Sequence, residues 1–284
     1  MGFLEKLRIS HRQMAIVLTI LALLPIVLTL TKTPIKLPIT IGKTTRDFYD
    51  RIQELPEGSI VAWANHVSYS GYIGKRDEYR AVVYHLFDRK LKLIMTSFWP
   101  DTQQLWTDLI AYSGVERRYN VKYGTDFVIF PFLAGEETAL AAVAADFHKA
   151  FTSDIYGTPV GNIPLMSGVF SLRDVQLTIS DAGSFTFIDM FVRQWPGAYG
   201  VKSINTYVFQ TVAPYYPRFV QGALDAERGA AEYEILTGYI GEQVLMLDGR
   251  NLQGIWVLVT IAMANIVYFG TRGRKAEVKE SVGR

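Results

Sequence analysis

Two long uncharged apolar segments lie near the two ends of this chain, and a sequence of ordinary polarity lies between them. The first segment covers residues 13–31 and the second covers residues 251–271. Each holds roughly 20 residues, which at about 1.5 Å rise per residue matches a hydrocarbon layer about 30 Å thick. The pattern therefore predicts a transmembrane helix at each position, with the lipid bilayer as a partner.

Each apolar segment also has a competing interpretation. The first resembles a signal peptide, but its apolar stretch exceeds the usual 7–15 residues and no small-residue cleavage site follows it. The second is also compatible with a buried core helix. Against that, Arg272, Arg274 and Lys275 follow it directly, and Trp256 and Tyr268 stand near its two ends, as interfacial aromatic residues do.

Basic residues beside the two segments predict the orientation. Lys6, Arg8 and Arg12 precede the first segment. Arg272, Arg274, Lys275 and Lys279 follow the second, which favours cytoplasmic termini and an extracytoplasmic central domain in the cell membrane. On this interpretation residues 1–12 are a cytoplasmic N-terminus and residues 272–284 are a disordered basic tail. Four basic residues just after the first segment favour the opposite orientation: Lys32, Lys36, Lys43 and Arg46.

Between the apolar segments, a Pro-containing linker at 32–45 precedes an expected α/β domain at 46–250. Short apolar stretches there alternate with amphipathic ones. The expected strands are 59–65, 92–98, 126–132, 174–180 and 202–211, and the expected helices are 46–55, 75–90, 102–115, 136–151, 184–195 and 222–240. This alternation predicts βαβ crossovers and a mostly parallel sheet, hence a Rossmann-like or flavodoxin-like three-layer sandwich flanked by the two transmembrane helices. It leaves the strand order open.

The connection at 152–173 is long and rich in glycine and proline, yet it has few charges. Ordered connections of this length are uncommon without a purpose. Its apolar side chains need a surface to cover them, which is either their own domain or a neighbouring subunit. The residues expected at such an interface are Ile155, Ile163, Leu165, Met166 and Phe170.

Charge and composition narrow the function. The N-terminal 31 residues carry a net charge of about +2, the central region about −3 and the tail after Thr271 about +3. An acidic centre argues against nucleic acid as a partner. The chain has no cysteine, which excludes disulfides and thiolate metal sites, and no histidine spacing typical of a metal site occurs. We therefore expect no metal and no cofactor.

Candidate chemistry lies in the loops that follow the expected strands, where α/β proteins bind ligands. Phosphate-binding and nucleophile-elbow motifs are missing from the sequence. His66 and Asp181 are the candidate catalytic residues, a base and its orienting partner, with Ser68 or Ser184 as nucleophile. A surface histidine and a helix-capping aspartate are the alternative interpretation. The candidate ligand-binding residues are Asn65, Trp99, Ser184 and Tyr215.

Four stretches resemble a family of uncharacterised prokaryotic membrane proteins with two spans and a central α/β domain. They are ELPEGSIV at 54–61, the 152–174 connection, GAAEYE at 229–234 and ANIVYF at 264–269. The resemblance implies the two-span architecture over nearly the full length and a hetero-oligomer with other membrane-anchored α/β proteins, and it implies no catalytic residue. The family has a glycine-rich loop after the fourth strand, whereas this chain has SDAGSFTF there.

These observations favour a membrane-anchored structural subunit without catalytic activity of its own, which associates with itself or with other membrane-anchored subunits. The alternative is a ligand-binding or sensory module that uses the carboxyl edge of the sheet. The third hypothesis is a membrane-tethered hydrolase built on His66 and Asp181. Partner, stoichiometry and ligand are not readable from the sequence.

Overall fold

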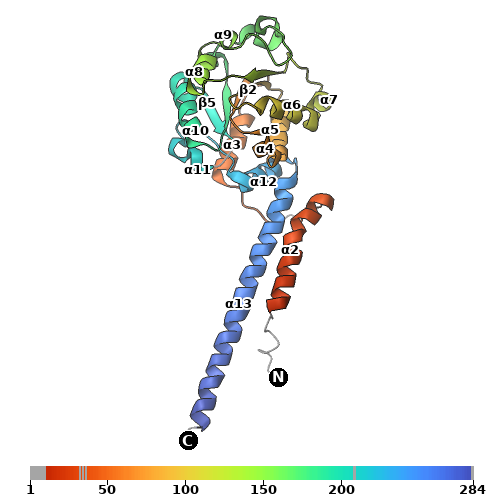
Figure 1. Ribbon diagram of the computed structural model, residues 1–284, viewed down its shortest axis with the longest axis vertical. Coiled ribbons are helices and arrows are strands. Elements are labelled where there is room, and N and C mark those ends of the chain that lie inside the picture. Colours follow the sequence, from red (N-terminus) through yellow and green to blue (C-terminus); the bar gives the residue numbers. More distant parts are fainter. Residues whose placement is uncertain (1–10, 32, 34, 36, 207–208, 283–284) are drawn as a thin grey trace. The chain divides into compact units, whose positions relative to one another are not determined.

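The computed structural model describes the chain except for residues 1–10, 32, 34, 36, 207–208 and 283–284 (Figure 1). The chain divides into two compact units. The larger is Ile39–Gln243, and the smaller combines Met1–Pro38 with Val244–Arg284. The larger unit contains residues 46–243 of the α/β domain predicted at 46–250, and residues 244–250 belong to the smaller unit.

Five parallel strands form the sheet of the larger unit. They are β1 (Ile60–Asn65), β2 (Lys92–Ser97), β3 (Phe127–Phe132), β4 (Leu177–Asp181) and β5 (Lys202–Asn205), and their order across the sheet is β3-β2-β1-β4-β5. All four neighbouring pairs are parallel. The predicted α/β class is therefore confirmed. The order is the Rossmann one, whereas a flavodoxin-like sheet has the order 2-1-3-4-5.

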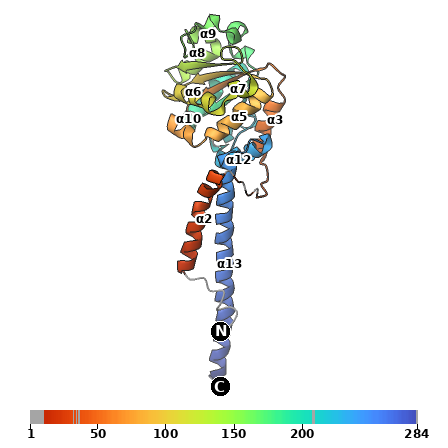
Figure 2. The same ribbon diagram turned by 90° about the vertical axis from the view of Figure 1, so that its right-hand side faces the viewer.

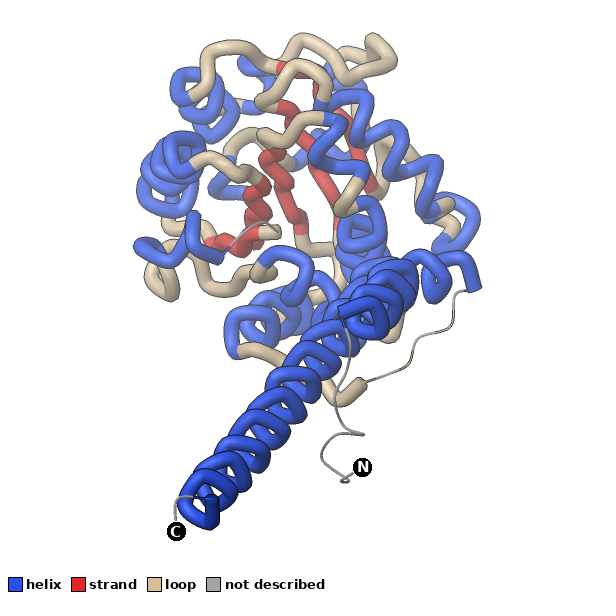
Figure 3. The backbone as a smooth tube through the Cα atoms, turned by 60° about the horizontal axis from the view of Figure 1, so that its bottom comes forward, coloured by secondary structure: helices blue, strands red, loops and turns tan. Residues whose placement is uncertain are grey.

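Helices cover both faces of this sheet (Figure 3). On one face are α3 (Lys43–Gln53), α5 (Arg76–Asp88), α6 (Thr102–Ser113), α7 (Val115–Tyr119) and α12 (Ala226–Thr237). On the other are α8 (Glu137–Ala145), α9 (Phe147–Ala150), α10 (Phe185–Val192) and α11 (Phe209–Val212). Because alternate residues of a strand point to opposite faces, Val61 and Trp63 of β1 enter the first core, and Ala62 and Ala64 enter the second.

Local capping residues divide two of the predicted helices. The predicted helix 136–151 is interrupted at Asp146, whose side chain accepts hydrogen bonds from the backbone of His148 and Lys149 and so begins α9. The predicted helix 102–115 ends at Gly114, which is left-handed with φ 60° and separates α6 from α7.

Other predicted bounds also differ from the structure. The predicted strand 202–211 stops at Asn205, and the predicted helix 222–240 begins only at Ala226. A short helix, α4 (Tyr69–Ile73), lies in the loop after β1, and a π-helical turn, η4 (Arg193–Gly197), and a 3-10 turn, η5 (Ala213–Tyr215), complete the unit.

The 152–173 connection folds onto its own domain. It forms three 3-10 turns, η1 (Val160–Asn162), η2 (Pro164–Gly168) and η3 (Leu172–Asp174). Val160, Ile163, Leu165 and Met166 are buried in the second core beside α8 and α9. The connection is therefore apolar because these side chains pack against the protein's own sheet and helices.

The smaller unit is a pair of helices, α2 (His11–Thr31) and α13 (Glu242–Val282). The two lie side by side in both views (Figures 1 and 2), and the Gln253 amide donates a hydrogen bond of 2.8 Å to the backbone oxygen of Leu21. The fully buried carboxylate of Asp248 accepts from the backbone of Ile35 and Leu37. The pair thus fixes the start of the linker as well.

No helix in the described part of the chain is both long enough and apolar enough to cross a membrane. The two flanking transmembrane helices are therefore not supported by the structure and stay a prediction. The C-terminal tail also differs from its prediction. Where the sequence pattern predicts disorder at 272–284, α13 continues to Val282, through a segment without proline and rich in lysine, arginine and glutamate, which favour helices.

Candidate functional site

Strands β1 and β4 lie next to each other at the centre of the sheet, and the chain leaves them towards opposite faces. From β1 it continues to α5 on one face, and from β4 it continues to α10 on the other. This divergence is the topological switch point at which open α/β sheets bind their ligands. The last residues of the two strands, Asn65 and Asp181, are register partners at this point.

An ammonium group from the β1–α5 connection lies at this switch point. Lys75 precedes the first turn of α5, and its Nζ donates a hydrogen bond to the backbone oxygen of Thr206, just beyond β5. The same Nζ lies 3.3 Å from a carboxylate oxygen of Glu78 and 3.6 Å from one of Asp181. One lysine therefore connects the start of α5 with the ends of β4 and β5.

The two carboxylates that face Lys75 are buried. The side chain of Glu78 is 2% exposed and that of Asp181 is fully covered. Burial raises the pKa of Glu78 to about 8, with a further upward contribution from the charges of Asp181 and Glu234 and an opposing one from Lys75. Burial also raises the pKa of Asp181 to about 6, against the opposing effect of Lys75 and the Thr206 hydroxyl.

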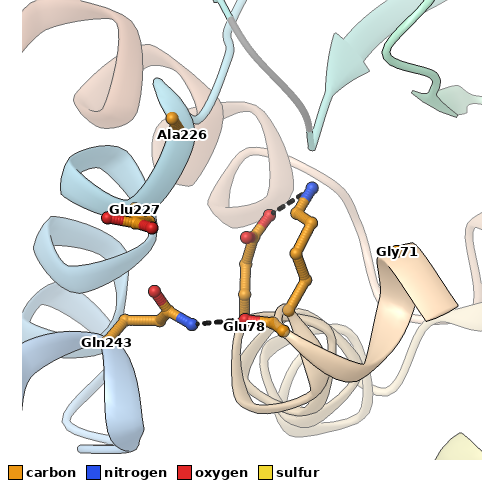
Figure 4. Close-up of a pocket in the computed structure, with 7 residues that line it drawn as sticks. Gly71, Glu78, Ala226, Glu227 and Gln243 are labelled. Atoms are coloured by element: carbon orange, nitrogen blue, oxygen red, sulfur yellow. Dashed lines mark hydrogen bonds and ion pairs between the residues drawn. The ribbon is translucent and has the colours of Figure 1, made fainter. Parts of the chain in front are cut away.

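A cavity of about 240 Å³ opens beside this cluster (Figure 4). It is lined by Gly71, Gly74, Lys75, Glu78, Ala226, Glu227 and Gln243, from the β1–α5 connection and from the starts of α12 and α13. Figure 4 shows Glu78, Glu227 and Gln243 around the same space. The Gln243 amide nitrogen donates to the Gly74 carbonyl at 2.8 Å, which identifies the other amide atom as the oxygen.

Several buried acceptors at this place have no hydrogen-bond donor within the described residues. They are Glu78 Oε1 and Asp181 Oδ1, which form the ion pairs with Lys75 but no hydrogen bond, together with Asp181 Oδ2 and the amide oxygen of Gln243. Buried polar atoms without a hydrogen bond are uncommon in folded proteins and mark either bound water or a functional site. The arrangement thus offers acceptors and negative charge to whatever enters the cavity.

The His66 ring lies between aromatic side chains. It stacks on Phe187 of α10 at 4.3 Å and meets Trp99 edge-on at 5.0 Å, and its burial lowers its pKa. The backbone nitrogen of His66 donates to the backbone carbonyl oxygen of Asp181 at 2.9 Å. The described residues show no hydrogen bond between the two side chains, so the geometry does not form the base and orienting pair that the hydrolase hypothesis requires.

The two candidate serines act at helix starts. Ser68 accepts a hydrogen bond from the backbone of Gly71 and begins α4, and Ser184 accepts from Phe187 and begins α10. These are ordinary N-cap roles. Neither hydroxyl is paired with His66 among the described contacts.

The candidate ligand-binding residues have separate environments. Asn65 is fully buried, accepts from Val67 and donates to the Tyr79 hydroxyl. Trp99 is 41% exposed beside His66, and Tyr215 is half-buried in η5. Neither Trp99 nor Tyr215 lines the described cavity.

Of the five residues predicted at an interface, three are covered by their own domain. Ile163, Leu165 and Met166 are buried, and Ile155 is half-buried against the first core. Phe170 is 55% exposed and stacks on His148. Of the five predicted residues, Phe170 is therefore the most exposed, and its role at an interface stays a prediction.

Sequence reasoning identified Asp181 and overlooked Lys75, Glu78 and Gln243. One signal was present: Glu78 stands four residues before Val82, which places a carboxylate on the apolar stripe predicted for the 75–90 helix. Gln243 gave no such signal in the sequence. It lies at the cavity only because it packs against residues that stand 165 or more positions earlier in the chain, such as Glu78 and Gly74.

Comparison with family models, with curated proteins and with solved structures gives no match for this chain.

The raised pKa of Glu78 predicts a pH-dependent stability. Between about pH 4.5 and pH 8 the folded protein holds a proton on Glu78 that the unfolded chain releases, so the free energy of unfolding falls as pH rises through this range. Glu78→Gln removes this group, and we expect the slope to become shallower by up to about 1.4 kcal/mol per pH unit. Denaturant unfolding of the full chain at pH 5, 6, 7 and 8 measures it.

Glu57→Gln is the matched control, because Glu57 is exposed and pairs with Lys90 at the surface. Its slope should equal that of the unchanged protein. An identical slope in Glu78→Gln would show that this carboxyl keeps an ordinary pKa in the folded state.

Proposed function

We propose that this protein is a membrane-anchored structural subunit whose α/β domain assembles with copies of itself or with other membrane-anchored subunits. The membrane anchor is supported mainly by the exposed apolar side chains of α2 and α13. Among the described residues, six large apolar side chains of α2 and nine of α13 are at least two-fifths exposed: Ile16, Ile20, Leu23, Ile26, Val27, Leu30, Met246, Ile255, Val257, Leu258, Val259, Ile261, Ile266, Tyr268 and Phe269. Contiguous apolar surface of this kind is typical of a membrane or protein contact.

The polar groups of the helix pair support the lipid environment. Residues 13–31 contain no charged side chain. The amide nitrogen of Gln253 on α13 donates a hydrogen bond to the backbone oxygen of Leu21 on α2, within the helix pair. The hydroxyls of Thr19 and Thr260 donate hydrogen bonds to backbone carbonyl oxygens one turn earlier on their own helices. Polar side chains that are paired within or between helices suit a lipid surrounding, which offers no hydrogen bonds.

Charged substitutions on α2 test the anchor. We expect the full chain to stay with membranes through alkaline carbonate extraction. Ile20→Arg with Leu23→Arg should release most of it, because each charge at the centre of a membrane helix costs roughly 2.5–3.5 kcal/mol. The control is Ile73→Arg, which changes an equally exposed side chain on the α/β domain and should stay in the membrane fraction. Release of the unchanged protein would refute the anchor.

The basic residues beside the apolar segments support cytoplasmic termini and an extracytoplasmic α/β domain. A reporter enzyme that is active only in the cytoplasm, fused after Arg284, should therefore be active. The matched fusion within the exposed turn at Gly58 should be inactive. The reverse pattern would assign the α/β domain to the cytoplasm.

The exposed aromatic side chains of the larger unit support assembly. They include Tyr156, Phe170, Phe185 and Trp99, and aromatic residues are enriched where proteins meet. In mild detergent we expect a protein mass of at least two copies of the 32.0 kDa chain, or one copy with further subunits. Light scattering with native mass spectrometry measures it. A single 32.0 kDa species would contradict the assembly.

The second candidate function is ligand binding at the carboxyl edge of the sheet. One observation favours it: the 240 Å³ cavity next to the switch point contains buried acceptors without donors. In the same native mass measurement, a small molecule retained by the chain would support this function.

A further inference from the structure

We propose that the cavity beside Lys75 binds a small organic cation with N–H donors, that is, a primary ammonium or guanidinium group. This inference rests on the second candidate function and names the chemical class of its ligand. It follows from three properties of the described residues: which hydrogen-bonding groups face the cavity, what charge they carry, and how much space they leave.

Two buried oxygens at the cavity form no hydrogen bond within the described residues. One is Glu78 Oε1, in a side chain that is 2% exposed, which has only an ion pair at 3.3 Å with Lys75 Nζ. Gln243 is 3% exposed, and its amide oxygen has no donor because the nitrogen is the atom that binds Gly74. A ligand that satisfies both must donate at least two hydrogen bonds, as ammonium and guanidinium groups do.

The donors that could attract an anion are already in use. The Lys75 ammonium has three hydrogens, and it faces three oxygens, on Thr206, Glu78 and Asp181. The positive ends of two helices also point towards the cavity, at the starts of α5 and α12. Each has acidic side chains of its own in the first turn, Asp77 and Glu78 in α5 and Glu227 in α12.

The charge around the cavity favours a cation. Lys75 supplies one positive charge, whereas Asp181 and the exposed Glu227 supply two negative charges even while Glu78 is protonated. Burial keeps Glu78 protonated near neutral pH, and a cation that binds next to it would favour release of that proton. Binding should therefore strengthen as pH rises from 6 to 8.

The ligand is small and organic. Drug-sized ligands occupy sites of roughly 300–1,000 Å³, so 240 Å³ suits a smaller molecule. The described residues contain no group of three or more side chains that could hold a metal ion. Gly71 and Gly74 leave part of the wall to backbone, which brings carbonyl acceptors close to the space.

The test uses the full chain in detergent with methylguanidinium and methylammonium as probes. Thermal unfolding at constant ionic strength, followed by tryptophan fluorescence, reports binding. We expect a saturable rise in Tm with either probe in the millimolar range, larger at pH 8 than at pH 6. Tetramethylammonium, which has the charge but no donor, should give a rise at least threefold smaller at equal concentration.

Variants locate the binding in this cavity. Glu78→Gln should weaken binding of methylguanidinium at least tenfold. Glu227→Gln changes an exposed side chain on the same cavity, so it tests the site without altering a buried group, and should weaken binding about threefold. Glu57→Gln, at the surface elsewhere, should bind like the unchanged protein.

The outcomes separate this inference from the function on which it rests. The proposal of a cationic ligand is refuted if neither probe gives a saturable rise in Tm up to about 100 mM. It is also refuted if both cavity variants bind the probes as tightly as the unchanged protein does. If acetate or phosphate instead gives a saturable shift that Glu227→Gln alters, the cation class is wrong and ligand binding at this cavity stands. If no ligand of either charge binds and native mass spectrometry finds no retained molecule, both fail.

Discussion

The arrangement of the α/β domain at the carboxyl edge of its sheet depends on one half-buried ammonium group. Lys75 lies where the chain leaves β1 for α5, and its contacts reach Glu78 on α5, Asp181 at the end of β4 and Thr206 beyond β5. Without this cation, two carboxylates would face each other in a buried place, which is strongly unfavourable. The lysine therefore holds together three segments that the parallel topology brings to one edge.

The same cluster explains why this edge is available for a ligand. A single ammonium cannot satisfy all the oxygens around it. It pairs with one oxygen each of Glu78 and Asp181, while the second oxygen of Asp181 and the amide oxygen of Gln243 have no donor in the described structure. A core built only for stability would pair or replace such groups. The polar cluster and the cavity coincide at the switch point of the sheet, where the fold itself leaves room.

The two units differ in where they place their apolar side chains. The larger one buries its apolar side chains in two cores, one on each face of the sheet, including most of the 152–173 connection. The helix pair of the smaller unit presents apolar side chains outward instead and pairs the polar groups of Gln253 and Asp248 inside itself. These properties underlie the proposed membrane anchor, which displays the α/β domain at a lipid surface.

The local pattern of the sequence determined the α/β class and the approximate position of all five strands, because apolar strands and amphipathic helices leave distinct periodicities. It also identified Asp181 as a residue at the critical edge. The strand order, the aromatic surroundings of His66, and the Lys75–Glu78–Gln243 surroundings were decided only by tertiary structure. Strand order is a property of long-range pairing, and the neighbours of a side chain at a strand end depend on which face the next helix covers. Burial of Glu78 and Gln243 likewise arises from packing of α5 against α12 and the start of α13. The cavity residues of α12 and α13 stand at least 148 positions after Glu78 in the chain, and no local pattern encodes such a contact.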